Sequence, residues 1–275
     1  MIDILLDTIL DILRILPFLF GTYLFLEWLE THAEHRFVHI LEKHHRLGPL
    51  FGSLLGLVPE CGFSSASSNL YTTGIIHAGT LIAVYLSTSD EMLPIMLSSH
   101  APWSKILPIL CVKLITACLA GYLVYFLVPK KKRDIDSFCE REHCECEQGI
   151  LHSALKHTVT ITAWLFVITL ILNGIIELAG MDSIRNLVIH YPNKSLLLCT
   201  LIGIIPNCAS SITLTTLYLE NVIPFGAVCA GLLANAGIGL LVLFRVNPDW
   251  KANLKISGFL IAVSLAAGMI IQIFA

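Results

Sequence analysis

The sequence predicts an all-α, multi-pass membrane protein made of two inverted repeats. Its mean hydropathy is +0.79 and only 13% of its residues are charged, a composition typical of integral membrane proteins. Apolar runs near the roughly 20 residues that span a bilayer as a helix recur along the chain. A stretch of the first half also reappears 147 residues later. We expect each repeat to contain three transmembrane helices and a re-entrant helical hairpin, which makes ten helical segments in the chain.

The candidate membrane spans set the number of crossings. The apolar runs near or above the spanning length are residues 4–29, 104–128, 159–179, 222–244 and 254–275. The first run is not expected to be a secretory signal peptide, because Asp3, Asp7 and Asp11 stand where such a peptide carries basic residues.

The repeat is visible as identities at a constant offset. Ten of the 31 residues from 56 to 86 are identical to the residue 147 positions later, without a gap. They are Gly56, Pro59, Cys61, Ser64, Leu70, Tyr71, Ile76, Gly79, Ala83 and Leu86. The same offset pairs Trp103 with Trp250 and Gly121 with Gly268. We therefore divide the chain into a first membrane repeat (1–128), a linker (129–147) and a second membrane repeat (148–275).

The first repeat indicates how its segments are arranged. In order they are a span at about 5–29, a polar, His-rich segment at 30–47, half-length helices at 49–58 and 62–74, an interrupted span at 76–99 and a last span at 104–128. A helix over 49–58 rises only about 15 Å, half a bilayer, which favours a re-entrant hairpin with its tip at Pro59 to Gly62. Three crossings are an odd number, so the second repeat must be inverted relative to the first.

Positive charge predicts the orientation, because cytoplasmic loops of membrane proteins are enriched in Lys and Arg. The linker carries four consecutive basic residues at 130–133 and a further one at Arg141. Residues 129–149 are therefore expected in the cytoplasm. Both termini are then expected on the extracytoplasmic side.

The predicted hairpin tips are PECG (59–62) and PNCA (206–209), and inversion would bring them from opposite faces to the midplane. Irregular backbone at membrane depth is tolerated only where protein or a water-filled cavity satisfies its polar groups. Paired broken helices in inverted repeats are typical of the substrate site of a secondary transporter. A re-entrant loop with a purely structural role is the alternative.

Acidic residues near these interruptions are candidates for ion binding, because ionisable groups at membrane depth are costly and usually functional. Glu60 lies at the first tip, and Asp90 and Glu91 interrupt the span at 76–99. The equivalent residues of the second repeat are neutral: Asn207, Gly237 and Ile238. Such asymmetry suits a cation held by the acidic repeat and completed by neutral oxygens of the other. Lys113 is expected to snorkel or to pair with one of the acids.

The side chains around the interruptions predict the kind of metal. The predicted ligands are Glu60, Cys61, Asp90, Glu91, Asn207 and Cys208, and the predicted polar path residues are Ser64, Ser87, Ser89, Ser210, Ser211 and Asn235. Carboxylate, amide and hydroxyl oxygens favour hard cations, whereas the two tip cysteines add softer sulfur. The mixture favours Mn²⁺, Fe²⁺ or Zn²⁺ over Ca²⁺. Alternatively, the cysteines are small residues that pack the tips together, since buried cysteine is usually inert.

Two further segments carry metal-ligating side chains. The first is the linker cluster of Cys139, His143, Cys144 and Cys146. Its spacing matches no standard structural zinc site, so it is either a flexible cytoplasmic metal-binding segment or a charged, solvated linker. The second segment, residues 30–46, places His32, His35 and His39 on one helical face. This pattern favours an interfacial amphipathic helix over metal guidance.

Residues 48–98 and 203–227 resemble a family of heavy-metal exporters, a ten-helix, arsenic-permease-like group also labelled as manganese transporters. The resemblance rests on the paired P-x-C tips and on the motif STSDE (87–91), and it covers essentially the whole chain. It implies efflux of a metal across the inner membrane of a bacterium or archaeon. The ten helices agree with the predicted architecture when each arm of a re-entrant hairpin is counted as a helix.

Together these observations predict a secondary active exporter of a divalent metal, with Mn²⁺ favoured, that works by alternating access. Proton antiport through Asp90 or Glu91 is the predicted coupling, with Na⁺ as the other candidate ion. The sequence carries no Walker motif, so we expect neither an ATP-driven pump nor an enzyme. The expected partners are the lipid bilayer, the metal substrate and the coupling ion, and a homo-oligomer is compatible with the sequence. We expect no nucleic acid and no tightly bound cofactor.

Two other functions remain open on the sequence alone. Half-helix N-termini after Gly62 and Ala209, rich in Ser and Thr, are suited to an oxyanion or carboxylate substrate. Cys61 and Cys208 would instead be a redox pair in a membrane enzyme or chaperone if their sulfurs lie within disulfide distance.

Overall fold

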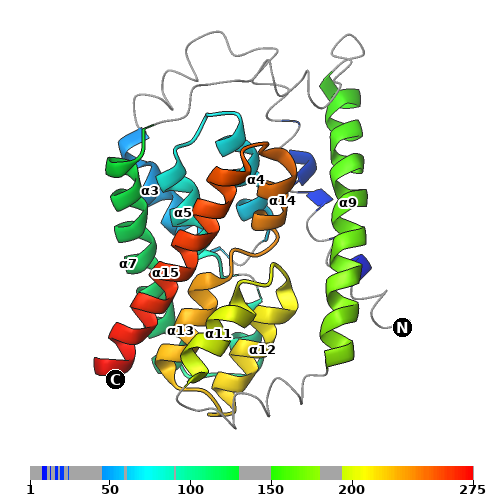
Figure 1. Ribbon diagram of the computed structural model, residues 1–275. Helices are drawn as coiled ribbons and strands as arrows, with labels where there is room; N and C mark the ends of the chain where they lie inside the picture. Colours follow the sequence, from blue (N-terminus) through cyan, green and yellow to red (C-terminus); the bar gives the residue numbers. More distant parts are fainter. Residues whose placement is uncertain are drawn as a thin grey trace.

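The computed structural model describes residues 8–10, 13, 16–17, 19–21, 24, 45–58, 61–89, 91–129, 150–179 and 194–274. Within these ranges every regular element is a helix, so the predicted all-α class is confirmed (Figure 1). The elements are η1 (His45–Leu47), α3 (Gly48–Gly56), α4 (Cys61–Thr72), α5 (Ala78–Ser87), α6 (Met92–Ser98), α7 (Trp103–Leu127), α9 (Ile150–Ala179), α11 (Ser195–Gly203), α12 (Cys208–Leu219), α13 (Phe225–Ala234), α14 (Gly239–Val246) and α15 (Trp250–Phe274).

Hydrophobicity places this chain in a membrane. In the described part of the chain, three stretches are long and apolar enough to cross a bilayer: Trp103–Leu127, Phe225–Val246 and Trp250–Phe274. They correspond to the predicted runs 104–128, 222–244 and 254–275, whereas the run 4–29 lies largely outside the described residues. The outer helices expose large apolar side chains, with Phe126 78% and Phe274 86% exposed. Such a surface is suited to lipid, and the protein is a multi-pass membrane protein.

The helices of the second half recur at the offset seen in the sequence. α3, α4, α5 and α7 begin and end 147 residues before α11, α12, α13 and α15. α6 begins 147 residues before α14, which is one residue longer. The same order of short and long helices is thus built twice.

Each half packs its own helices in the same sequence. α3 packs on α5 and α5 on α7, just as α11 packs on α13 and α13 on α15. Glycines allow the closest of these contacts. A Cβ added to Gly121 would stand 2.8 Å from the carbonyl oxygen of Gly79, and one added to Gly226 would stand 2.8 Å from that of Gly268. Small residues that bring helix backbones together are the usual packing device of membrane helices, which lack a hydrophobic driving force between them.

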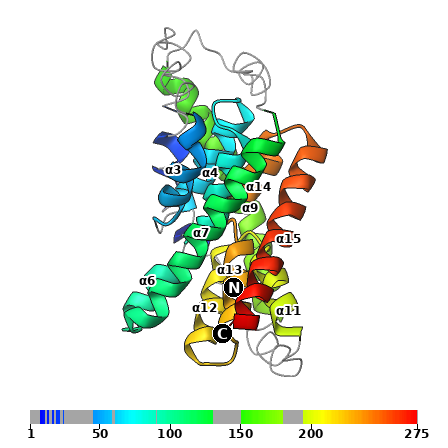
Figure 2. The same cartoon turned by 90° about the vertical axis from the view of Figure 1, so that its left-hand side faces the viewer.

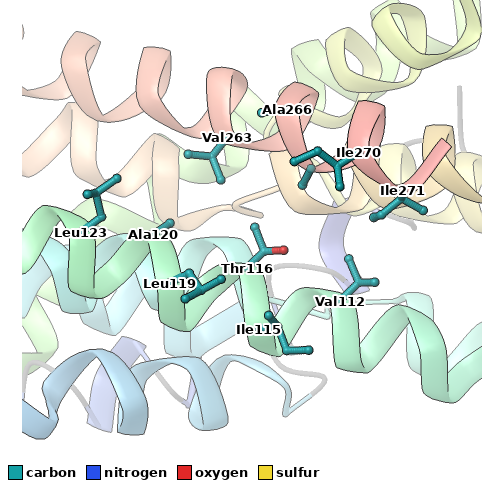
Figure 3. A pocket seen from close by; sticks show the side chains of 11 residues that line it. Val112, Ile115, Thr116, Leu119, Ala120, Leu123, Val263, Ala266, Ile270 and Ile271 are labelled. Carbon is teal, nitrogen blue, oxygen red and sulfur yellow. The ribbon is translucent and has the colours of Figure 1, made fainter. Parts of the chain in front are cut away.

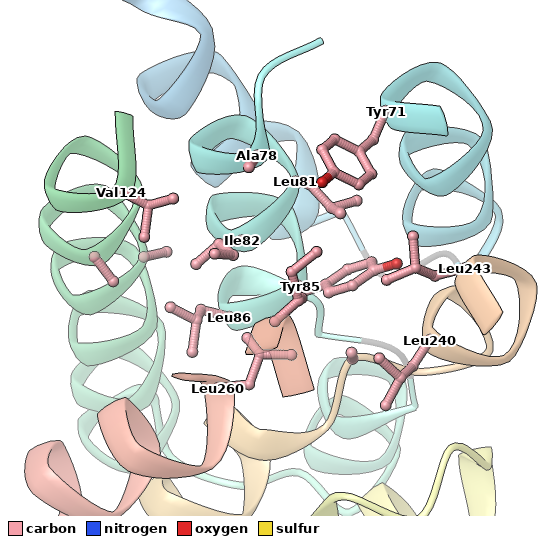
Figure 4. Packing of buried hydrophobic residues seen from close by; sticks show 14 of the residues in the cluster. Tyr71, Ala78, Leu81, Ile82, Tyr85, Leu86, Val124, Leu240, Leu243 and Leu260 are labelled. Atoms are coloured by element: carbon pink, nitrogen blue, oxygen red, sulfur yellow. The ribbon is translucent and has the colours of Figure 1, made fainter. Parts of the chain in front are cut away.

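The two halves are joined by exchanged contacts. α4 of the first half packs on α14 of the second, and α12 of the second half packs on α6 of the first. Between them lies a buried apolar cluster to which both halves contribute, with Tyr85 and Leu86 from α5 close to Leu240 and Leu243 from α14 and to Leu260 from α15 (Figure 4). The halves therefore form one interior rather than two separate cores.

Equivalent helices point in opposite directions. α7 rises from the end of the molecule that carries α6, whereas α15 descends toward that end (Figure 2). The start of α5 lies beside the end of α7, because His77 Nε2 donates to the Val128 carbonyl oxygen over 2.9 Å. The end of α12 lies beside the start of α7, where Lys105 Nζ donates to Asn221 Oδ1 over 3.2 Å. α4, which leads into α5, and α12 therefore end at opposite ends of the molecule.

An outward-facing groove separates α7 from α15 (Figure 3). Its volume is about 570 Å³, and its lining is aliphatic apart from the hydroxyl of Thr116. A groove without charged or amide side chains is suited to lipid chains and not to an ion. The chemistry of a transporter must therefore be sought in the interior.

The glycine contacts generate a test of the packing. We expect Gly226→Ala to lower the melting temperature of the detergent-solubilised protein, because its methyl group meets the Gly268 carbonyl and overpacking costs about 1–3 kcal/mol. Gly258→Ala on α15 is the matched control, since nothing lies within 4 Å of a Cβ there. It should leave the melting temperature unchanged or raise it. Equal melting temperatures for the two variants would refute this account of the α13–α15 contact.

Candidate functional site

Helices are interrupted at four places in the interior. The first half breaks between α3 and α4 (57–60) and between α5 and α6 (88–91), and the second half breaks at the equivalent positions, 204–207 and 235–238. A backbone hydrogen bond of 3.2 Å from Ser89 N–H to the Gly56 carbonyl links the first two. The sequence predicted interruptions at the tips and at Asp90–Glu91, and the helices stop there. Each break leaves helix-end N–H and C=O groups that need other partners.

α4 and α12 both begin close to the break between α13 and α14. Ser64, in the first turn of α4, lies against Gly239, the first residue of α14, where an added Cβ would stand 2.6 Å from the Ser64 Cβ. Cys208, the first residue of α12, belongs to the same buried cluster as Ile238, the last residue of that break. The starts of α4 and α12 thus approach one region of the interior. The two helices then leave it toward opposite ends of the molecule.

Two asparagines shape the breaks of the second half. Asn207 is 1% exposed, and its Oδ1 accepts a 3.3 Å hydrogen bond from the N–H of Ala209, which caps α12. Asn235 is 2% exposed, and its Oδ1 accepts a 2.9 Å hydrogen bond from the N–H of Gly237. Gly237 has a φ of 58°, a left-handed conformation that favours glycine. An amide oxygen has a second lone pair, so both side chains retain an acceptor for an ion.

The predicted path serines are buried and donate their protons to nearby carbonyls. Ser87 and Ser89 donate to Val84 and Ser87 carbonyls at the end of α5, over 3.1 and 3.2 Å. Ser210 and Ser211 donate to the Asn207 and Cys208 carbonyls, over 2.7 and 2.9 Å. A hydroxyl whose proton is committed in this way presents lone pairs outward, which suits a cation. Ser64 is also fully buried.

The acidic residues are only partly within view. Glu91 is half-buried and precedes α6 as its N-cap residue. Glu60, Asp90 and the linker cluster of Cys139, His143, Cys144 and Cys146 lie outside the described residues, as does the side chain of Cys61. In the part of the chain that the structure describes, no three His, Cys, Asp or Glu side chains form a metal-binding group. The assignment of these residues as ligands therefore stays a prediction.

Cys208 has an apolar environment. The side chain is 3% exposed, carries a free thiol and shares a cluster with Ala154, Ile161 and Leu165 of α9. Such surroundings are suited to packing as well as to an occasional soft ligand.

A polar network that sequence reasoning missed ties the two halves together. The Tyr85 hydroxyl lies 2.6 Å from Ser68 Oγ, and both groups donate to the Gly239 carbonyl, over 3.0 and 2.7 Å. Tyr85 and Ser68 are both fully buried. Tyr85 lies in an apolar run and looks like an ordinary core residue in the sequence. Only the contact of α4 and α5 with α14 reveals what its hydroxyl does.

Lys113 is the charged side chain deepest in the described interior. It extends from the middle of α7, is 1% exposed and donates from Nζ to two carbonyl oxygens, those of Thr88 at the end of α5 and Leu232 near the end of α13. The distance to the Leu232 oxygen is 3.0 Å. The sequence prediction of a snorkelling side chain is wrong, because the ammonium points into the protein between two interrupted helices.

Comparison with protein families places this architecture. The profile of a family described as "Putative, 10TM heavy-metal exporter" matches residues 1–134 and residues 123–254. The chain belongs to this family. The resemblance inferred from the tips is thereby confirmed, and so is the coarse function of a membrane exporter. The searches of curated proteins and of solved structures found no match. Within the heavy-metal exporter family, the metal and its ligands must be argued from the chain itself.

The Tyr85 network generates a second test. We expect Tyr85→Phe to destabilise the solubilised protein by about 1 kcal/mol, the usual net value of one buried hydrogen bond. Ser68→Ala should cost at least as much, and the double variant should cost less than the sum because the two hydroxyls share one acceptor. Tyr122→Phe, on α7 and outside the network, is the matched control. Additive effects measured by thermal unfolding would exclude a shared network.

Proposed function

We propose that this member of the heavy-metal exporter family is a secondary active exporter of divalent metal, with Mn²⁺ preferred, and that it works by alternating access. The ion binds between the tips at residues 59–61 and 206–208. The observation that carries the proposal is the convergence of α4 and α12 on the α13–α14 break, in an interior rich in buried amides and hydroxyls. Broken helices that meet in the interior of a membrane protein are the usual construction of an ion-binding site.

The proposed architecture is a pair of inverted repeats, each with a re-entrant hairpin. The opposite directions of α7 and α15 support the inversion, and so do the opposite ends reached by α4 and α12 (Figure 2). In such a pair, each hairpin closes the path from one side of the membrane. Rocking of one repeat against the other then exposes the same ion alternately to the two sides, which is alternating access.

The proposed metal ligands come from both halves. Glu60 and Asp90 supply negative charge from the first repeat, with Glu91 beside them. Asn207 Oδ1 adds a neutral oxygen from the second repeat, and the hydroxyls near the breaks line the path. Cys61 and Cys208 add sulfur at the tips. Mn²⁺ accepts oxygen ligands readily and tolerates softer ones, whereas Ca²⁺ and Mg²⁺ select oxygen alone.

Energy for export comes, in this proposal, from proton exchange at Asp90 or Glu91. A carboxyl group in a poorly solvated site holds its proton more firmly than in water, and a metal ion displaces that proton. The linker faces the cytoplasm because of its basic residues, and its cluster of Cys139, His143, Cys144 and Cys146 would collect metal near the cytoplasmic entrance. Both termini then lie outside the cytoplasm.

The anion alternative is less well supported. An anion would bind to the N–H groups at the starts of α4 and α12. In α12 the side chain of Asn207 already occupies one of them, the N–H of Ala209, and Asn207 Oδ1 turns an acceptor toward this end of the helix. The acidic residue Glu60 at the equivalent position of α4 would repel an anion.

The inversion has a direct test. Ser104 and Lys251 are exposed, lie 147 residues apart and occupy the second position of α7 and of α15. We expect Ser104→Cys and Lys251→Cys to react with a membrane-impermeant thiol reagent from opposite sides of the membrane, with the unchanged protein as the blank. Reaction from the same side would mean parallel repeats.

The metal site has a functional test. We expect Asp90→Asn to reduce Mn²⁺ transport by at least about tenfold in vesicles, because the site loses one of its negative charges. Asp249→Asn is the control, since Asp249 is an exposed carboxylate in the turn between α14 and α15. Undiminished Mn²⁺ flux through Asp90→Asn would rule out this cation site.

A further inference from the structure

We propose that the ammonium of Lys113 is a resident cation: it occupies a backbone carbonyl site between the two halves where a free monovalent cation would otherwise bind. The transporter then needs no Na⁺, because one cation of its ion inventory is covalently attached. This inference extends the proposed function to the choice of coupling ion and rests on it for its meaning in transport. The binding chemistry itself can be examined without any transport.

The position of the ammonium is the first argument. Lys113 is 1% exposed, although lysine is almost never fully buried unless its charge is compensated. Its Nζ donates to the carbonyl oxygens of Thr88 and Leu232, which belong to different halves of the protein. The charge is thus compensated by backbone oxygens contributed by two elements, α5 and α13.

The state of those carbonyls is the second argument. In a continuous helix the N–H of residue 92 would bond the Thr88 carbonyl, but Met92 N–H bonds Ser89 instead, over 3.0 Å. The carbonyl of Leu232 would likewise bond residue 236, but α13 ends at Ala234. Both oxygens are therefore left over by the helix breaks. They also lie at helix C-terminal ends, where the helix dipole favours positive charge.

The chemistry of the site is the third argument. Carbonyl oxygens at the C-terminal ends of interrupted helices are the groups that coordinate Na⁺ in membrane transporters. An ammonium carries the same single charge and donates to the same oxygens. A tethered ammonium therefore holds the two breaks together permanently, whereas Na⁺ would do so only while bound.

The second half lacks this cation. The residue 147 positions after Lys113 is Leu260, which is fully buried in the apolar cluster beside Tyr85 (Figure 4). The equivalent positions thus hold a charged and an apolar side chain of similar reach, on helices that pack alike. This pair provides a matched control: truncation at either position opens a buried space, but only one space faces the two carbonyls.

The experiment measures melting temperature in detergent, in NaCl and in choline chloride of equal concentration. We expect the unchanged protein to melt at the same temperature in both salts. Lys113→Ala should melt at a lower temperature in choline chloride and recover by several degrees in NaCl, because Na⁺ enters the vacated site. Lys113→Arg, which retains a cation, should be indifferent to Na⁺.

Leu260→Ala should be destabilised equally in the two salts. A Na⁺ response of Leu260→Ala as large as that of Lys113→Ala would overturn the proposal, and so would a Na⁺-dependent melting temperature of the unchanged protein. Lys113→Ala that fails to fold in either salt, or that ignores Na⁺, would overturn it as well. In vesicles, Mn²⁺ export by Lys113→Ala should become at least about tenfold faster with Na⁺ than without it.

The two readouts separate the inference from the proposed function. An unchanged protein that transports no Mn²⁺, together with Na⁺-dependent stability of Lys113→Ala, would refute the metal substrate and leave the resident cation intact. Mn²⁺ transport by the unchanged protein, with no Na⁺ effect on the variant, would do the reverse.

Discussion

A polar backbone group inside a membrane must find a partner within the protein, and this constraint shapes the whole interior of this exporter. Continuous helices such as α7 and α15 meet it by themselves and can face lipid. The interrupted helices cannot, so buried side chains complete them. Asn207 caps α12, Asn235 holds the following break and Lys113 takes two leftover carbonyls. The polar interior is thus a consequence of the interruptions, and a site for an ion is the use to which it is put.

The fold is repeated but its chemistry is not. Helix bounds recur at an offset of 147 residues, and the glycine pair Gly79–Gly121 recurs as Gly226–Gly268 because close backbone contact is needed in both halves. Charge and hydrogen-bonding groups differ at equivalent positions: Lys113 faces Leu260, and Tyr85 faces Leu232 in the alignment of the halves. Packing constrains both copies alike, whereas a single ion between them needs only one set of charges.

The sequence allowed much of the fold to be predicted. Proline and glycine near residues 59–62, with a half-bilayer apolar length before them, indicated where α3 ends and α4 begins, since these signals act locally. The polar run before Pro94 indicated the break between α5 and α6 for the same reason. The partners across the breaks were not predictable. Nothing in an apolar run suggests that the Tyr85 hydroxyl and Ser68 share the Gly239 carbonyl, because such contacts join residues far apart in the chain.

By itself, the sequence determined that this is a duplicated, all-helical membrane protein of the heavy-metal exporter type, and where its helices are interrupted. These properties depend on hydrophobic length, local backbone preference and internal identity, all of which are written in consecutive residues. Only the tertiary structure decided that α4 crosses to α14 and that α4 and α12 begin near one break. It also decided that Lys113 turns inward. Those outcomes depend on which distant carbonyls and surfaces meet when the two halves pack.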